Sequence, residues 1–406
     1  MIQDLKTTDE SNKITIEALK KLKNSTLFNL SLGSKELFHS NFLGWLAENY
    51  SLEVGSIFSK FINENKVLNF KLIPPLREKQ NIDLTFIFKD DLSDDNQVLI
   101  IENKVKSLPS ISQLEEYSKA HRSNKNYLLL SLYKPGFIDE NNQVIINDTI
   151  KWNFLSYKEL AVLIKNIKPK TDYDKFVIDD YICFIENLSL LESAIIIDWE
   201  KDSFNFYRGD EIDEYLNFRK LRIHDFYLKH KYNQIQNKII EEITKLEKNS
   251  KLVFDGEWLD GNEGECFFEN GFTRSQGLVG FKYIVKKVKY QSPLVLGLQL
   301  QGNSLRLIVE CPDGQVALRT AKELKELKDK GVWFNFKELY KYQDNVEVKG
   351  NGKKDNDKEF ASFSGKFFYK YVNIDNIKMI DLIRLITHYY FYLNNNFQEI
   401  SKNAII

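Results

Sequence analysis

The chain is poor in cysteine and has almost no excess of charge, and both shortages exclude classes of protein. Its three cysteines, Cys183, Cys266 and Cys311, lie far apart without the CxxC or CxxH spacing of zinc sites. We therefore predict free, buried thiols. The 57 basic and 58 acidic residues give a net charge of -1, so the whole molecule lacks the basic excess of many nucleic-acid-binding proteins. Any phosphate-binding surface must be local.

Long apolar runs are also missing. No run approaches the roughly 20 residues that a membrane-spanning helix needs, and the polar stretch MIQDLKTTDESNK at the N-terminus fits neither a secretory signal nor a transit peptide. We therefore expect a cytoplasmic protein without a membrane segment. The 406 residues, 43% of them hydrophobic, exceed what one compact core usually holds, which favours two domains.

The N-terminal part, residues 1–195, has the pattern of an α/β domain. Helical periodicity at 13–30 and in SKELFHSNFLGWLAENY is followed by three strand-like runs, FKLIPPLREKQ, IDLTFIF and QVLIIENK. An amphipathic helix near 110–122 and the apolar strand NYLLLSLY come next. The order helix, three strands, helix, strand predicts a meander and a crossover, and hence a mixed sheet flanked by helices.

The remainder of the chain divides into two further parts. Residues 196–250 predict a helical connector that includes one long helix over 215–248. Residues 251–406 predict an α+β C-terminal domain of unknown role, because alternating and aromatic runs over 252–318 are typical of an antiparallel sheet. A final helix is expected over 375–394.

Acidic residues stand at the ends of two neighbouring strands of the N-terminal domain. Asp83 opens IDLTFIF, and Glu102, Asn103 and Lys104 close VLIIENK. Because side chains alternate along a strand, Glu102 and Lys104 should lie on one face and Asn103 on the other. A hairpin would bring the two carboxylates together, and their mutual repulsion is relieved by a divalent cation. The pattern therefore predicts a site for Mg²⁺ or Mn²⁺.

These motifs, NIDLTF, IIENK and SQLEEY, resemble those of the PD-(D/E)XK nuclease superfamily, which has a restriction-endonuclease-like fold. Gln113 and Tyr117 lie four residues apart on the predicted helix, like the QxxxY motif of a bacterial branch of the superfamily. The resemblance covers about residues 30–195. It departs from the family name at Ile82, which replaces proline at a position that does not bind metal.

The resemblance implies a Mg²⁺-dependent nuclease that hydrolyses phosphodiester bonds, with DNA as the expected substrate. It implies that Asp83, Glu102 and the main-chain carbonyl of Asn103 hold the metal, with Glu36 as an additional ligand. Lys104 would position the attacking water and help to deprotonate it. The products would be a 5′-phosphate and a 3′-hydroxyl, and the family implies a role in defence against foreign DNA or in repair.

Gln113, Tyr117 and His39 are weaker candidates for the site. The resemblance implies that Gln113 and Tyr117 contact the scissile-strand phosphate or support the site. His39 follows Glu36 at i+3 and could touch a substrate phosphate, but we expect a packed helix residue. A homodimer, or a protein partner bound through the C-terminal domain, is also compatible with the family.

Each candidate also has a structural explanation. Asp83 could begin a strand or cap a hairpin, Glu102 and Lys104 could form a solvated charge pair, and Tyr117 could be a half-buried packing residue. Glu36 could interact with the dipole of its own helix. A second hypothesis is therefore a catalytically silent binding or sensor module that acts through its C-terminal domain, and metal binding distinguishes the two.

Overall fold

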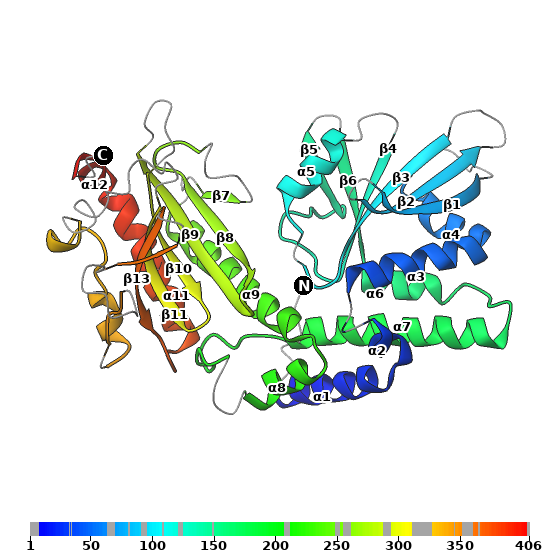
Figure 1. Ribbon diagram of the computed structural model, residues 1–406, viewed down its shortest axis with the longest axis horizontal. Helices are drawn as coiled ribbons and strands as arrows, with labels where there is room; N and C mark the ends of the chain where they lie inside the picture. The colour runs from blue at the N-terminus through cyan, green and yellow to red at the C-terminus, as the bar shows by residue number, and fades with distance from the viewer. Residues whose placement is uncertain are drawn as a thin grey trace. The chain divides into compact units, whose positions relative to one another are not determined.

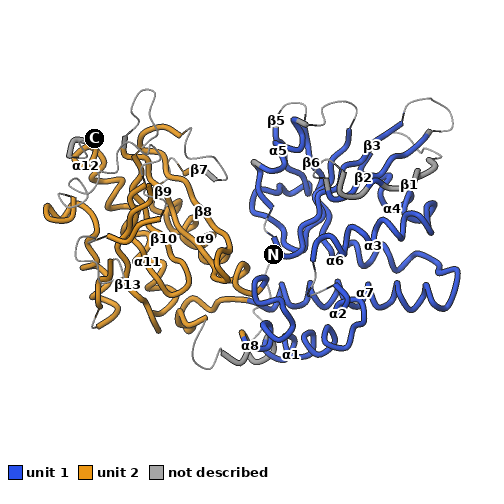
Figure 2. The backbone as a smooth tube through the Cα atoms, viewed as in Figure 1, with its two compact units in different colours: residues 1–195, 216–226 blue, residues 196–215, 227–406 orange. Residues whose placement is uncertain are grey.

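The computed structural model forms two units that are each compact, as Figure 2 shows. Unit 1 comprises residues 1–195 and 216–226, and unit 2 comprises residues 196–215 and 227–406. Residues 196–250, for which a helical connector was predicted, are thus shared between the units. The structure describes residues 8–31, 33, 35–62, 70–79, 82–90, 96–107, 109–120, 125–147, 150–206, 212–247, 252–254, 261–286, 294–310, 327–344, 346–350, 360–363 and 366–403.

Unit 1 is a mixed α/β unit in which N-terminal helices precede a six-stranded sheet of order β1-β2-β3-β4-β6-β5 (Figure 1). The first three strands form the predicted antiparallel meander. Strands β3, β4 and β6 are parallel to one another, and β5 pairs with β6 in antiparallel orientation. Its helices are α1 (Thr8–Asn24), α2 (Thr26–Leu30), α3 (Glu36–Asn49), α4 (Ser51–Ser59), α5 (Ile111–Ala120), α6 (Tyr157–Ile164) and α7 (Asp172–Ala194). Its strands are β1 (Phe70–Lys79), β2 (Ile82–Asp90), β3 (Asn96–Lys104), β4 (Lys125–Ser131), β5 (Gln143–Asn147) and β6 (Ile150–Ser156).

Strand β3 is buried on both faces, as its continuous apolar run predicts. On one face Ile100 packs in a cluster with Leu129 of β4 and Leu114 of α5. Trp152 of β6 belongs to the same cluster and donates a hydrogen bond of 2.9 Å to Ser118 of α5. The opposite face of the sheet contacts α3. The end of β3 is therefore enclosed between α5 and α3.

Two predicted helices are each divided in the structure. The helical pattern over 13–30 contains α1 and α2, because the Ser25 side chain accepts a hydrogen bond of 3.1 Å from the Phe28 N–H and starts a new helix. The predicted helix over 215–248 is divided into α8 (Ile212–Lys220) and α9 (His224–Leu246).

The break between α8 and α9 has a local physical cause. Arg222 adopts a left-handed conformation with φ of 60°, and the Ile223 N–H donates to the Phe218 carbonyl at 3.0 Å. Both apolar side chains, Phe218 and Ile223, are fully buried. This is the pattern of a helix end in which a left-handed residue is followed by a hydrophobic contact.

Unit 2 contains a seven-stranded sheet of order β12-β13-β11-β10-β9-β8-β7. Six of these strands are antiparallel, and β7 pairs in parallel with β8. The predicted antiparallel sheet of the C-terminal part is thus present. Its elements are β7 (Leu252–Phe254), β8 (Cys266–Thr273), β9 (Gln276–Lys286), β10 (Leu294–Gln301), β11 (Ser304–Glu310), the 3-10 helix η3 (Lys337–Lys341), β12 (Ala361–Phe363), β13 (Phe367–Asn373), α11 (Met379–Asn395) and α12 (Phe397–Asn403).

The two faces of the unit 2 sheet differ in chemistry. One face is apolar: Leu298 and Leu307 are opposite each other in the sheet and fully buried. On that face Phe281 packs against Tyr390 of α11, with ring centroids 6.2 Å apart. Gln299 and Arg306 pair across the same two strands and belong to the other face.

The prediction of free, buried thiols is confirmed for one of the two cysteines that the structure describes. Cys266 is a buried free thiol as predicted, whereas the free Cys183 is only half-buried. Cys311 lies outside the described residues.

Within the described parts of the chain, no helix has both the length and the hydrophobicity to cross a membrane.

Candidate active site

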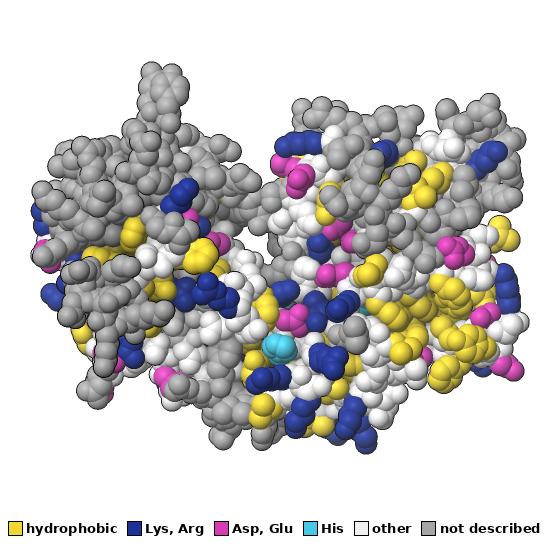
Figure 3. All heavy atoms as spheres, in the orientation of Figure 1, with side chains coloured by type: hydrophobic (Ala, Val, Ile, Leu, Met, Phe, Trp, Pro, Cys, Tyr) yellow, Lys and Arg dark blue, Asp and Glu magenta, His cyan; other side chains and the backbone are white. Residues whose placement is uncertain are grey.

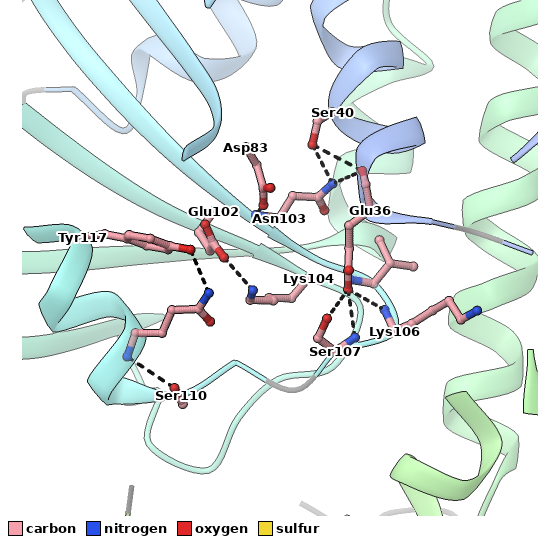
Figure 4. A network of polar contacts seen from close by, with 12 residues as sticks. Glu36, Ser40, Asp83, Glu102, Asn103, Lys104, Lys106, Ser107, Ser110 and Tyr117 are labelled. Atoms are coloured by element: carbon pink, nitrogen blue, oxygen red, sulfur yellow. Dashed lines mark hydrogen bonds and ion pairs between the residues drawn. The ribbon is translucent and has the colours of Figure 1, made fainter. Parts of the chain in front are cut away.

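The candidate residues of β2 and β3 lie together at one end of the unit 1 sheet. Leu84 pairs with Ile101, so Asp83 and Glu102 are the next residues of the two antiparallel strands. The Asp83 carboxylate accepts a hydrogen bond of 2.8 Å from the Asn103 N–H. Figure 4 shows the side chains of Asp83, Glu102 and Lys104 gathered at this point. The hairpin therefore brings together the two carboxylates and the ammonium group that the sequence singled out.

Glu102 and Lys104 form a buried ion pair, not a solvated one. The Lys104 Nζ lies 2.6 Å from Glu102 Oε1, and the two residues are 8% and 2% exposed. The second carboxylate oxygen, Glu102 Oε2, is buried and has no hydrogen-bond partner among the described residues. A buried carboxylate oxygen without a donor is costly. The pair therefore leaves one acceptor position of Glu102 unsatisfied.

The two charges perturb each other strongly. Burial, and then the nearby Asp83 carboxylate, raise the pKa of Glu102 to about 7 against the opposing effect of Lys104. Burial alone would lower the pKa of Lys104, but the Glu102 carboxylate outweighs it, so the pKa of Lys104 is raised. The cluster thus has more negative than positive charge, and an additional cation would stabilise its ionised form.

Asn103 points to the opposite face, as strand alternation predicted. Its side-chain amide donates to the Glu36 carbonyl at 3.0 Å and to the Ser40 hydroxyl at 3.1 Å, both on α3. Its side-chain oxygen accepts a hydrogen bond from the buried Tyr157 hydroxyl. These bonds fix β3 against α3 and α6. Sequence analysis singled out neither Ser40 nor Tyr157, and no local sequence signal marks them.

The Glu36 carboxylate holds the loop that follows Lys104. Its Oε1 accepts hydrogen bonds from the N–H groups of Val105, Lys106 and Ser107 at 3.3, 3.2 and 2.9 Å, and another from the Ser107 hydroxyl. Burial opposes ionisation of Glu36, but the bonds from Ser107 outweigh it and lower the pKa of the carboxyl. A role in positioning therefore accounts for Glu36, and its part as a metal ligand stays a prediction.

Tyr117 of α5 lies beside the ion pair of Glu102 and Lys104 (Figure 4). The Gln113 side-chain amide donates to the Tyr117 hydroxyl at 2.8 Å. Burial, and then the Glu102 carboxylate, raise the pKa of the Tyr117 phenol, which places the ring within electrostatic reach of the pair. The structure thus brings the QxxxY residues to the same site, although Tyr117 also packs against the core cluster.

His39 is a packed helix residue, as expected. It is fully buried, lies 3.0 Å from the Tyr181 hydroxyl through Nδ1, and stays neutral because burial lowers its pKa to about 3. It has no access to solvent and therefore no direct part in the site.

The turn between α8 and α9 is a neighbour that sequence analysis did not connect with the site. Lys106, two residues after Lys104, donates to the Arg222 carbonyl at 3.1 Å and lies 3.0 Å from Asp225. His224 is within electrostatic range of Lys106 and Arg219. Figure 3 shows several Lys and Arg side chains, with acidic side chains among them, grouped around a histidine on one face of the molecule. A local basic surface therefore accompanies the acidic cluster.

The donor set fits a hard divalent cation with few protein ligands. Across the described residues, no group of three or more His, Cys, Asp or Glu side chains is arranged to hold a metal. Mg²⁺ is commonly held by one or two carboxylates together with waters and substrate phosphates. The carboxylates of Asp83 and Glu102, the latter with its unsatisfied Oε2, meet that requirement.

No family model, curated protein or solved structure matches the chain.

Proposed function

We propose that unit 1 is a Mg²⁺-dependent nuclease that hydrolyses phosphodiester bonds of DNA, built on a restriction-endonuclease-like sheet. The observation that carries the proposal is the buried Glu102 oxygen without a partner, placed beside Asp83 and the Lys104 ammonium. Strongly perturbed pKa values that arise from burial and a specific charge partner are typical of functional sites. The Asp83 carboxylate also disfavours ionisation of Glu102, and a bound cation would relieve this repulsion.

Asp83, Glu102 and the main-chain carbonyl of Asn103 would hold the metal. When bound, Mg²⁺ would supply charge stabilisation for the phosphoryl oxygens and a water of lowered pKa. Asp83 is fixed for this task by the hydrogen bond from the Asn103 N–H. The contacts of Asn103 with α3 hold the strand end in place.

Lys104 remains an ammonium group in this account. Its pKa is raised by Glu102, so at neutral pH it donates hydrogen bonds and does not accept a proton. We therefore assign Lys104 to positioning the attacking water and stabilising negative charge on the phosphate. Its expected share in deprotonating the water is not favoured by the direction of this shift.

Gln113 and Tyr117 would bind the scissile phosphate. The Tyr117 oxygen accepts the hydrogen bond from Gln113, which leaves the phenolic hydrogen available as a donor. Because the pKa of Tyr117 is raised, this hydrogen is retained throughout the neutral range. Phenol and amide donors orient a phosphate without competing for the cation.

The test is cleavage of labelled linear, circular and single-stranded DNA, with an RNA control, in Mg²⁺ and in Mn²⁺. Wild type is compared with Lys104→Ala and with Lys119→Ala, a matched control whose side chain on α5 is 66% exposed. We expect Lys104→Ala to lower the rate of cleavage by about a hundredfold or more, because it removes a donor that stabilises negative charge. Lys119→Ala should cleave DNA at the rate of wild type.

Two results would contradict the nuclease. Equal cleavage by wild type and folded Lys104→Ala would assign the activity to another site or to a contaminant. Absence of cleavage by wild type on every substrate would make the silent binding or sensor module the better account. Circular dichroism of each variant checks folding independently of activity.

A further inference from the structure

The polar face of the unit 2 sheet contains a half-buried arginine, Arg306. Arg306 lies on β11, directly between Gln299 of β10 and Tyr371 of β13 in the register of the sheet. One guanidinium nitrogen donates to the Gln299 side-chain oxygen at 3.1 Å. The guanidinium carbon lies 4.9 Å from the centroid of the Tyr369 ring, which is within cation–π range.

The Arg306 guanidinium has no carboxylate partner among the described residues. Its Nε is buried without a hydrogen-bond acceptor. Burial lowers the pKa of Arg306 against the opposing effect of the Tyr369 phenol, and the neighbouring Arg274 also lowers it, so a second positive charge is close by. Partial burial of a charge without a counter-ion is costly, and the exposed Arg274 adds a second positive charge, so an anion beside Arg306 would be favoured.

A hollow of about 240 Å³ opens at this arginine. It is lined by Arg306 together with Ser304, Gly350, Ala361, Ser362, Tyr369 and Tyr371, and no Asp or Glu is among its described lining residues. The volume is below the roughly 300–1,000 Å³ of pockets that enclose a drug-sized ligand. The hollow therefore suits a compact anionic group that belongs to a larger molecule.

Aromatic rings continue along the same face from this hollow. Phe367, Tyr369 and Tyr371 occupy alternate positions of β13, with ring centroids 5.7 and 6.0 Å apart, and all three are half-buried. Alternation along a strand places them on the same face as Arg306. A row of such rings provides stacking surfaces for planar groups, as in proteins that bind single nucleic-acid strands.

We propose that this hollow binds the phosphate of a nucleotide unit, with Arg306 as its principal ligand. The planar guanidinium matches the geometry of phosphate oxygens, and the Tyr369 and Tyr371 phenols, on the same face of the sheet as Arg306, offer further donors. The base or sugar of the nucleotide lies against the rings of β13. This site is separate from the chemistry proposed for unit 1 and needs no divalent metal.

The test uses the full-length protein in EDTA, so that a metal-dependent reaction does not contribute. Binding of a fluorescein-labelled dT octamer is measured by anisotropy for wild type, Arg306→Gln and Arg384→Gln. The last is a matched control, because Arg384 of α11 is 62% exposed and paired with Asp381. We expect Arg306→Gln to weaken binding at least tenfold and Arg384→Gln to change it less than twofold.

Competition identifies the source of the phosphate. Displacement of the octamer by AMP at similar molar affinity would indicate a free nucleotide, whereas displacement only by unlabelled octamer would indicate a nucleic-acid strand, and both support the site. Inorganic phosphate that competes as well as AMP would overturn the nucleotide assignment. Wild type that binds neither octamer nor AMP at millimolar concentration would overturn the proposal.

A second variant protects the test against misfolding. Arg306→Lys keeps the charge but loses the planar group, and we expect an intermediate loss of affinity. Thermal unfolding without ligand should show Arg306→Gln to be as stable as wild type, because the replaced charge had no carboxylate partner. Unchanged octamer affinity in a folded Arg306→Gln or Arg306→Lys protein would contradict the proposal.

Discussion

The two sheets of the molecule bury charge in opposite ways. At the end of β3, two carboxylates share one ammonium group, and Glu102 keeps an oxygen without a donor. On β11, Arg306 is half-buried with a fully buried Nε, has no carboxylate partner among the described residues, and has a second arginine nearby. The first cluster therefore has more negative than positive charge, and the second has positive charge without a carboxylate beside it among the described residues. A charge removed from solvent points to a ligand when the folded protein supplies too little opposite charge around it.

The largest expected difference between the clusters is in stability. Lys104→Met removes the only ammonium that contacts Glu102 in the described structure, so at pH 8 we expect the free energy of unfolding to fall by roughly 2–4 kcal/mol. Arg306→Met removes a charge without a carboxylate partner, and we expect a change of at most about 1 kcal/mol, from the lost bond to Gln299. Urea unfolding in EDTA measures both.

Matched controls make this contrast sharp. Lys119→Met and Arg384→Met replace exposed cations in the same two units and should each cost less than about 0.5 kcal/mol. Equal destabilisation by Lys104→Met and Arg306→Met would break the comparison, since it would mean that both cations are compensated in the folded protein.

A smaller effect is expected from pH. The pKa of Glu102 is raised to about 7 in the folded protein and is near 4.3 in an unfolded chain. Between these values the folded state binds more protons than the unfolded state, so its stability falls as pH rises from about 5 to 8. We expect a decrease of roughly 1–3 kcal/mol in EDTA. Glu102→Gln should abolish most of this slope, and an unchanged slope would contradict the assignment to Glu102.

The smallest expected effect concerns the loop after Lys104. Ser107→Ala removes one donor from the Glu36 carboxylate while three backbone donors remain. We expect a loss of about 1 kcal/mol in stability and a rise in the pKa of Glu36. NMR titration of the Glu36 carboxyl measures the second effect, and Ser193→Ala, at an exposed hydroxyl of α7, is the control.

Much of the β3 site could be predicted because strand geometry is local. The apolar run before Glu102 predicts a strand, and a period of two then places Glu102 and Lys104 on the face opposite Asn103. The burial of the ion pair could not be predicted, because it depends on α5 and α3, which the chain brings in from either side. The partners of Glu36 also depend on packing between segments that are distant in sequence.

The site on unit 2 was missed for a different reason. The stretch FFYKYVN, which holds Phe367, Tyr369 and Tyr371, is rich in aromatic residues, which is a strand signal, but sequence analysis predicted no strand there. Arg306 alternates with buried leucines in LRLIVE, yet nothing in that pattern reveals that its neighbours lack a carboxylate. Compensation of a charge is a property of the assembled sheet.

Calorimetric titration of Mn²⁺ into wild type and Asp83→Asn at pH 8 tests directly whether the end of β3 binds a divalent cation. We predict one ion per chain for wild type, an affinity at least tenfold weaker in Asp83→Asn, and little change in thermal stability of the variant in EDTA. Wild-type binding should also weaken roughly tenfold at pH 6, where Glu102 is protonated. Absence of binding, or equal affinity in the variant, would contradict a metal site at the end of β3.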